Sequence, residues 1–174
     1  MSAMKGAISV LDAGQVLSLS YAEITKYHGP GSPGGVAHAF KVMERAWPLL
    51  GTGGAPPERR EITVRTAFGG PGARDAFEFV TRAVTGKRYV VDGSLARPEH
   101  GRARERFVFR LSCRDREVTL FLREGYVTDE FIDLARTDNR GAEEEARLSV
   151  LKQEMADLVM AAPAENVYDV EDSR

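Results

Sequence analysis

Two short loops rich in glycine and proline constrain the fold of this chain more than any other feature. The first, residues 29–35, has the sequence GPGSPGG, and the second, residues 69–72, has the sequence GGPG. Each loop leads directly into a run of apolar residues at helical spacing. Because a helix start presents unpaired amides and a partial positive charge, we expect a pocket for an anionic or electron-rich ligand if the two starts converge. The alternative is that both loops are tight turns in which glycine supplies unusual backbone angles.

Apolar periodicity predicts the helices around these loops. A capping box at Ser20 and Glu23 predicts a short helix that ends at Gly29. The next helix stops near Gly51, and the helix after residues 69–72 ends by Gly86. Their apolar faces are Val36, Phe40, Met43, Trp47 and Leu50 in the first, and Ala73, Ala76, Phe77, Val80 and Val84 in the second.

The remaining segments complete an α+β pattern. Thr128 is the candidate N-cap of a helix over residues 129–135, and a last helix carries an apolar stripe. That stripe is Leu148, Leu151, Met155 and Leu158. The predicted strands are residues 61–67, 88–92, 107–111 and 118–122, the last two as a hairpin. Strands and helices in this order predict an α+β domain.

Composition sets the outer limits. The chain of 174 residues is 43% hydrophobic and 29% charged, which suits one compact domain. We divide it into an N-terminal arm (1–19), an α+β core (20–170) and a tail (171–174). A net charge of −2 lacks the basic character of a nucleic-acid binder. No segment approaches a membrane span, so we expect a cytoplasmic protein that contacts neither nucleic acid nor membrane.

The first loop resembles a motif of a known family. Proteins of the FmdE-like formylmethanofuran dehydrogenase family are metal-associated α+β proteins found beside molybdenum or tungsten enzymes. They begin with an aromatic residue followed by H-G-H-x-C-P-G, which leads into an apolar helix. Residues 27–34, YHGPGSPG, resemble this frame, with Pro30 in place of the second histidine and Ser32 in place of the cysteine.

Later segments extend the resemblance to about residues 20–170. Residues 70–76 resemble the family segment D-G-C-A-x-D-A, in which Asp75 matches and Gly72 replaces the cysteine. Residues 81–87 resemble T-G-C-T-x-G-K without its cysteine, and residues 161–170 resemble A-P-P-E-E-L-F-E-V. The zinc ribbon that often follows in the family has no counterpart in this sequence.

The resemblance implies a helix–strand–helix–three-strand core with a mixed sheet, here with extra N- and C-terminal helices, and a homodimer. It also implies a site for a divalent metal such as zinc. Zinc commonly takes four nitrogen, sulfur or oxygen ligands, and only His28 remains as a strong donor at the family's ligand positions. A tight metal would therefore need Asp75, a backbone carbonyl or a second protomer as well.

These observations define one candidate site between the two glycine loops. Tyr27 and His28 would form its wall, and Lys87 would supply a counter-charge. The full set of candidate ligand-binding residues is Tyr27, His28, Gly29, Ser32, Gly70, Gly72, Asp75 and Lys87, and His28 is also the candidate metal ligand. His38 falls at the edge of an apolar stripe and is predicted to be a surface or boundary histidine.

Three functions fit this sequence. The preferred one is a non-catalytic accessory protein that binds a small molecule or cofactor, because the loop frame is kept while a catalytic set is not. The second is an enzyme that uses the same cleft, with His28 as acid or base and Asp75 orienting it. The third is an interaction module that docks on a larger oxidoreductase.

Overall fold

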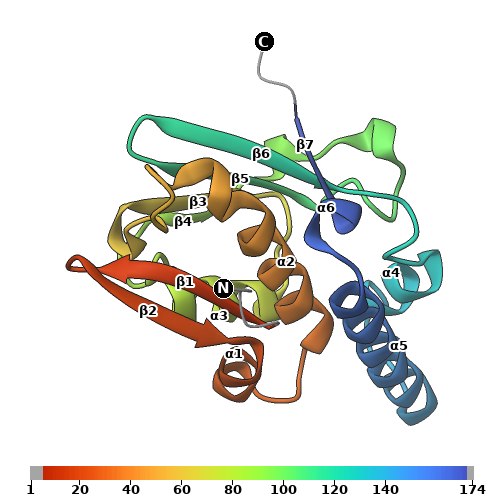
Figure 1. Cartoon of the computed structure of the whole chain (residues 1–174). Coiled ribbons are helices and arrows are strands. Elements are labelled where there is room, and N and C mark those ends of the chain that lie inside the picture. The colour runs from red at the N-terminus through yellow and green to blue at the C-terminus, as the bar shows by residue number, and fades with distance from the viewer. Residues whose placement is uncertain (1–5, 172–174) are drawn as a thin grey trace.

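The structure, a computed structural model, describes residues 6–171, so residues 1–5 of the predicted arm and 172–174 of the predicted tail lie outside it. The fold is α+β, as predicted (Figure 1). Its strands are β1 (Ala7–Asp12), β2 (Gln15–Ser20), β3 (Ile62–Thr66), β4 (Tyr89–Val91), β5 (Val108–Cys113), β6 (Arg116–Leu122) and β7 (Tyr168–Val170). Its helices are α1 (Tyr21–His28), α2 (Pro33–Leu50), α3 (Pro71–Thr81), α4 (Asp129–Ala135), α5 (Ala142–Ala161) and α6 (Ala164–Val167).

A mixed five-stranded sheet forms one layer, in the order β4-β3-β5-β6-β7. Strands β3 and β4 run parallel, and the other neighbours in this sheet run antiparallel. Helices α2 and α3 lie below the sheet in Figure 1, and the core fills the space between the two layers. The predicted hairpin is confirmed as β5 and β6, with Leu111 opposite Val118.

Helix α2 is enclosed on all sides over its first half. Every residue from Gly34 to Met43 is buried, because the sheet, α3, α5 and strand β1 surround this part of the helix. The predicted apolar face of the helix is confirmed as core. His38 is also fully buried, so the prediction of a surface or boundary histidine is wrong. Contacts with segments distant in the chain cover the face that the local pattern leaves open.

His38 joins α2 to the last strand. Its Nδ1 atom lies 2.9 Å from the hydroxyl oxygen of Tyr168 in β7, and its ring packs 4.8 Å from the ring of Phe107. Burial lowers the pKa of His38 to about 3, so the imidazole is neutral near pH 7. Tyr168 is itself fully buried, and burial raises its pKa well above the usual value.

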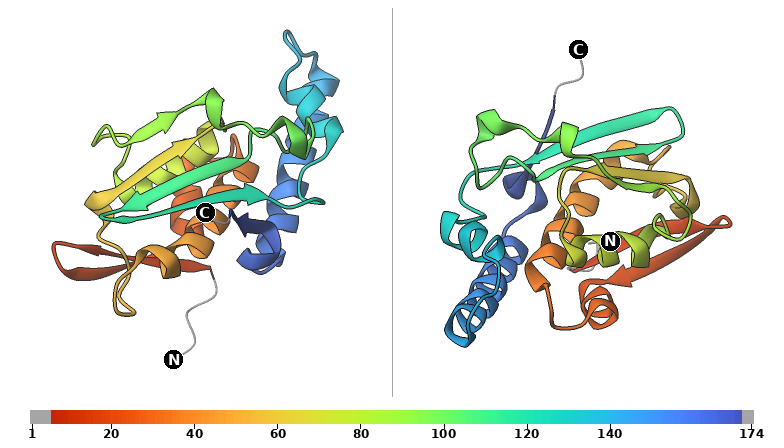
Figure 2. Two further views of the ribbon diagram at one scale, coloured as in Figure 1. Left: turned by 90° about the horizontal axis from the view of Figure 1, so that it is seen from above. Right: turned by 180° about the vertical axis from the view of Figure 1, so that it is seen from behind.

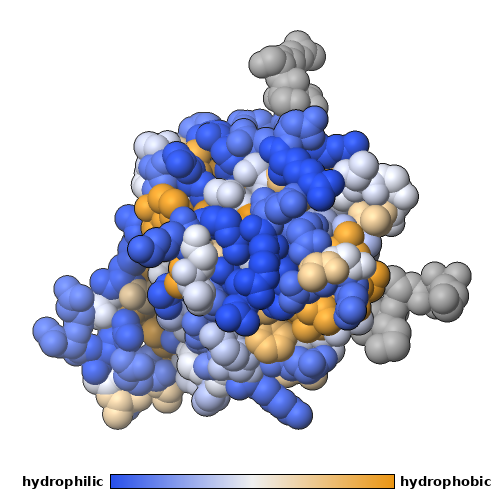
Figure 3. Space-filling view, turned by 90° about the vertical axis from the view of Figure 1, so that its left-hand side faces the viewer, coloured by the Kyte–Doolittle hydropathy of each residue, from blue (hydrophilic) through white to orange (hydrophobic). Residues whose placement is uncertain are grey.

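The N-terminal segment is a β-hairpin rather than the weakly patterned arm that the sequence suggests. Strand β1 pairs antiparallel with β2 through a turn at Ala13 and Gly14, whose φ angles are 50° and 81°. Ile8 and Val10 point to the same face and enter the core. Small and polar residues between them hide this alternation in the sequence. The side of the molecule that carries the turn is mostly hydrophilic, with smaller apolar areas (Figure 3).

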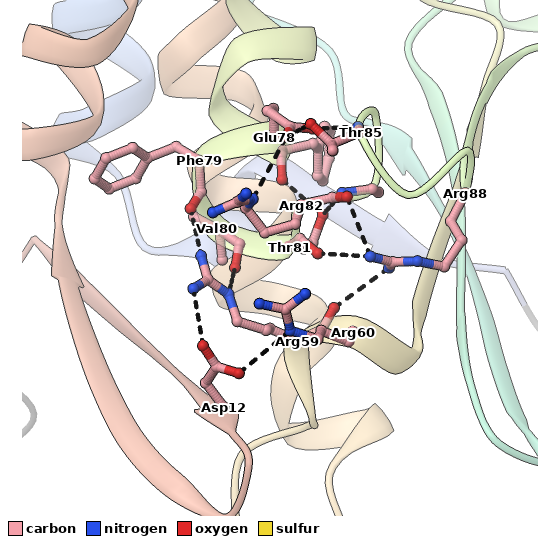
Figure 4. A network of polar contacts seen from close by, with 12 residues as sticks. Asp12, Arg59, Arg60, Glu78, Phe79, Val80, Thr81, Arg82, Thr85 and Arg88 are labelled. Carbon is pink, nitrogen blue, oxygen red and sulfur yellow. Dashed lines mark hydrogen bonds and ion pairs between the residues drawn. The ribbon is translucent and has the colours of Figure 1, made fainter.

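Two arginines cap the carbonyl end of α3 (Figure 4). Arg59 donates from Nε to the carbonyl of Val80 at 3.0 Å and from Nη2 to the carbonyl of Phe79 at 2.7 Å. Arg88 donates from Nη2 to the carbonyl of Thr81 at 3.0 Å. Last-turn carbonyls lack partners within a helix, so these two side chains satisfy groups that would otherwise be left unpaired.

Helix α3 therefore ends at Thr81, earlier than the predicted end near Gly86. Arg82 follows with a φ of 59°, in the left-handed region that terminates helices. Val84 lies in the turn beyond it and is only partly buried, so its assignment to the apolar face of the helix is wrong.

Helices α4 and α5 pack against each other at one end of the molecule (Figure 2). The predicted cap is confirmed, since the hydroxyl of Thr128 accepts from the amide of Phe131 at 3.1 Å. In α5 the predicted stripe is buried at Leu148, Leu151 and Met155, but Leu158 is 50% exposed.

We predict that His38 makes folding sensitive to acid. Its pKa is about 3 in the folded protein and about 6.5 in the unfolded chain, so the unfolded state binds one more proton between these values. The contribution to stability is complete above pH 6.5 and is lost as the pH falls, by about 2 kcal/mol at pH 5. The measurement is the free energy of unfolding against pH for the native protein and for His38→Gln, which keeps a polar group but cannot titrate. Equal pH dependence in the two proteins would contradict this prediction.

Candidate ligand-binding site

The structure brings the two glycine loops into backbone contact. A Cβ atom on Gly35 would lie 3.2 Å from Cα of Gly72, and one on Gly72 would lie 2.3 Å from the carbonyl oxygen of Ser32. Real Cβ atoms do not approach a backbone oxygen so closely, so this crossing needs glycine at position 72. The first turns of α2 and α3 therefore lie side by side.

A cavity of about 410 Å³ opens beside this contact. The starts of α2 and α3 form one wall, and α4 and α5 form the wall across from residues 103–107. The residues around it are Ser32, Gly34, Gly35, Phe68, Gly69, Gly70, Pro71, Gly72, Ala103, Arg106, Phe107, Phe131, Ile132, Ala135, Arg136, Arg140, Leu148, Lys152 and Met155. This volume lies within the range of small-molecule sites in proteins.

The helix starts present free amides to this cavity. Both helices begin with proline, which has no amide hydrogen, and neither Ser32 nor Gly70 caps its helix with a side chain. Within residues 6–171, the amides of Gly34, Gly35 and Gly72 donate no hydrogen bond to the protein. Such amides can donate to an anion or to a carbonyl oxygen of a ligand.

Basic side chains surround the opening. Arg106 follows the basic run before β5, Arg136 and Arg140 come from the end of α4 and the loop after it, and Lys152 comes from α5. Lys152 donates from Nζ to the carbonyl of Gly31 at 3.1 Å, which ties α5 to the first glycine loop.

His28 and Asp75 lie together behind the first loop. Nδ1 of His28 is 2.8 Å from Oδ2 of Asp75, and the amide of Ser32 donates to Nε2 of His28 at 3.0 Å. Because Nε2 accepts this amide, the ring proton lies on Nδ1 and is donated to the carboxylate. The His28 side chain is only 7% exposed. We call this set of three residues the His28 clamp; it fixes the end of the loop at the start of α2.

The sequence-predicted site residues thus fall into two groups. Ser32, Gly70 and Gly72 line the cavity, whereas the other five do not. His28 and Asp75 act in the clamp, and Gly29 ends α1 with a φ of 87°. Tyr27 is 52% exposed and packs on Phe79, with ring centroids 5.3 Å apart. Lys87 is exposed in the turn after α3 and is not the cation that faces the cavity.

The basic residues of α4, α5 and their connection were missed from the sequence. Arg106 belongs to a basic run that sequence analysis can single out, but Arg136 and Arg140 carry no local motif. Only the fold shows that α4 and α5 reach the glycine loops.

A metal site has little support from the arrangement of donors. Within residues 6–171, no group of three or more histidine, cysteine, aspartate or glutamate side chains is arranged to hold a metal ion. His28, the candidate ligand, has only Asp75 beside it, and its second ring nitrogen already accepts the amide of Ser32.

Comparison with known proteins leaves the family open. No family model matches the sequence, and no curated protein matches it. Across the described range 6–171, none of the helices combines the length and apolar character that crossing a membrane requires.

We predict that Gly72→Ala destabilises the fold. The new Cβ would meet the Ser32 carbonyl at 2.3 Å and the amide nitrogen of Val36 at 3.0 Å, both backbone atoms that cannot rotate away. Overpacking of this kind costs about 1–3 kcal/mol. Chemical denaturation of both proteins measures the difference. Gly69→Ala is the matched control, because nothing lies within 4 Å of a Cβ there. Equal stability of the two variants would show that the helix starts can separate freely.

We also predict that His28→Ala lowers the free energy of unfolding by about 1–3 kcal/mol, because the Ser32 amide and the Asp75 carboxylate lose their partner. Lys26→Ala, at an exposed position on the same helix, serves as the control in thermal and chemical denaturation. A variant as stable as this control would show that the clamp does not hold the loop.

Proposed function

We propose that this protein is a non-catalytic binding or accessory protein that holds a small molecule or cofactor in the cavity between the two glycine loops. The cavity itself carries the proposal: it combines free backbone amides, an apolar interior and a size suited to small ligands. The resemblance to the FmdE-like formylmethanofuran dehydrogenase family supports the same interpretation. It adds a homodimer and an oxidoreductase partner as parts of the proposal.

The second candidate function, catalysis by His28 and Asp75, has one observation in its favour. The two side chains lie within hydrogen-bond distance, as a base and its orienting group would. However, a base needs a free nitrogen that faces the substrate, and Nε2 of His28 is occupied by the Ser32 amide. His28 also does not line the cavity. The pair therefore fits a structural role better than a catalytic one.

We predict that filling the cavity abolishes binding while leaving the fold intact. Ala135 lines the cavity from the end of α4 and is exposed, so Ala135→Trp can place an indole in the opening. Ala146 is an exposed alanine of α5 that does not line the cavity, and Ala146→Trp is the control. The probes are two fluorescent molecules of similar shape, neutral phenylnaphthylamine and anionic anilinonaphthalene sulfonate.

We expect at least one probe to bind the native protein and Ala146→Trp, with at least ~10-fold weaker binding to Ala135→Trp. Thermal denaturation checks that both variants fold. If neither probe binds, or if Ala135→Trp binds them as well as the control does, the proposed function is wrong.

A further inference from the structure

The charges around the cavity have one sign. Its lining contains Arg106, Arg136, Arg140 and Lys152 but neither aspartate nor glutamate. The chain as a whole has 26 acidic residues and 24 lysines and arginines. A lining without acids in a protein with slightly more acids than bases indicates a local positive potential, which favours anions.

These charges differ in how far the protein neutralises them. Within residues 6–171, Arg106 has no ion-pair or hydrogen-bond partner for its guanidinium. Lys152 bonds to a carbonyl oxygen, which leaves its positive charge uncompensated. Arg136 has Glu105 at 3.9 Å, at the outer limit of an ion pair. Arg140 is neutralised more fully, because its Nε donates to Glu145 at 2.8 Å.

Arg140 still shapes the opening. Its Nη1 donates to the carbonyls of Leu134 and Thr137 at 3.1 and 3.0 Å and also, at 3.4 Å, to that of Ala135. These bonds hold the turn between α4 and α5 beside the cavity. The free charges of Arg106, Arg136 and Lys152 therefore surround an opening whose far wall is fixed.

The opposite side of the cavity is apolar. Phe68 stacks on Phe107 with ring centroids 4.5 Å apart, and Phe131, Leu148 and Met155 also contribute to the lining. Aromatic and aliphatic walls of this kind bind an apolar or aromatic body of a ligand. A small inorganic anion alone would leave these walls uncovered.

From this arrangement we propose that the ligand is an organic anion, with a carboxylate or phosphate group at the basic side and an apolar, ring-sized body against the phenylalanines. The amides of Gly34, Gly35 and Gly72 add donors for the anionic group. This inference rests on the proposed function and narrows it to one chemical class.

The test compares the two fluorescent probes, which share an aromatic body but differ by a sulfonate. At low salt the anionic probe should bind at least ~10-fold more tightly than the neutral probe, because charge-assisted hydrogen bonds are about twice as strong as neutral ones. The preference should shrink as salt is raised, since the opening is exposed to solvent. Arg106→Gln and Arg136→Gln should each reduce the preference.

Arg65→Gln provides a control with the same change in net charge. Arg65 is an exposed residue of β3, paired with Asp92, and does not line the cavity. This variant should keep the native preference for the anionic probe. Equal effects of Arg65→Gln and of both cavity variants would show that the overall charge attracts the probe, and the inference would be wrong.

Competition separates the two anionic groups. Naphthoate and naphthyl phosphate should each displace the sulfonate probe more strongly than naphthol, and the stronger of the two identifies the preferred group. Inorganic phosphate should compete far less than naphthyl phosphate, and equal competition would overturn the apolar half of the inference. If the neutral probe binds as tightly as the anionic one and Ala135→Trp weakens both, the ligand class is wrong while the proposed function stands.

Discussion

The backbone contact between Gly35 and Gly72 is the constraint on which the site depends. It holds the first turns of two helices side by side, with a separation that excludes a side chain on Gly72. Each helix start carries a partial positive charge, so their approach is electrostatically unfavourable unless packing elsewhere maintains it. That packing comes from the apolar faces of α2 and α3, which are buried together under the sheet. The core thus supports an arrangement of like partial charges that a negative group in the cavity would stabilise.

The same packing explains why α2 tolerates a buried histidine. The helix lies between sheet, α3 and α5, so every position in its first half needs either an apolar side chain or a satisfied polar one. His38 meets this condition through Tyr168, which comes from the last strand of the sheet. Its pKa of about 3 is the result of burial without a charged partner. The contact links the ends of the fold, because Tyr168 is close to the end of the described chain.

Local patterns were sufficient to predict the elements whose cause is local. The Ser20–Glu23 capping box, the Thr128 cap and the β5–β6 hairpin are confirmed because neighbouring residues determine them. The end of α3 was misplaced because Arg59 and Arg88, distant in the chain, take its last carbonyls. Three of the predicted site residues, Ser32, Gly70 and Gly72, do line the cavity. The basic residues of α4 and α5 could not be predicted, because their position depends on how two distant helices pack.

The His28 clamp gives a physical reason for a histidine in this loop that does not involve a metal. Its two ring nitrogens are both used, one by Asp75 and one by the Ser32 amide, so the residue determines the geometry of the loop. At the position where the resembling family has a cysteine, Gly72 has no room for any side chain, because its Cβ would meet the Ser32 carbonyl. A thiolate ligand at this position would require α2 and α3 to move apart. The local packing of this chain therefore favours ligand contacts through backbone amides and basic side chains over contacts through sulfur.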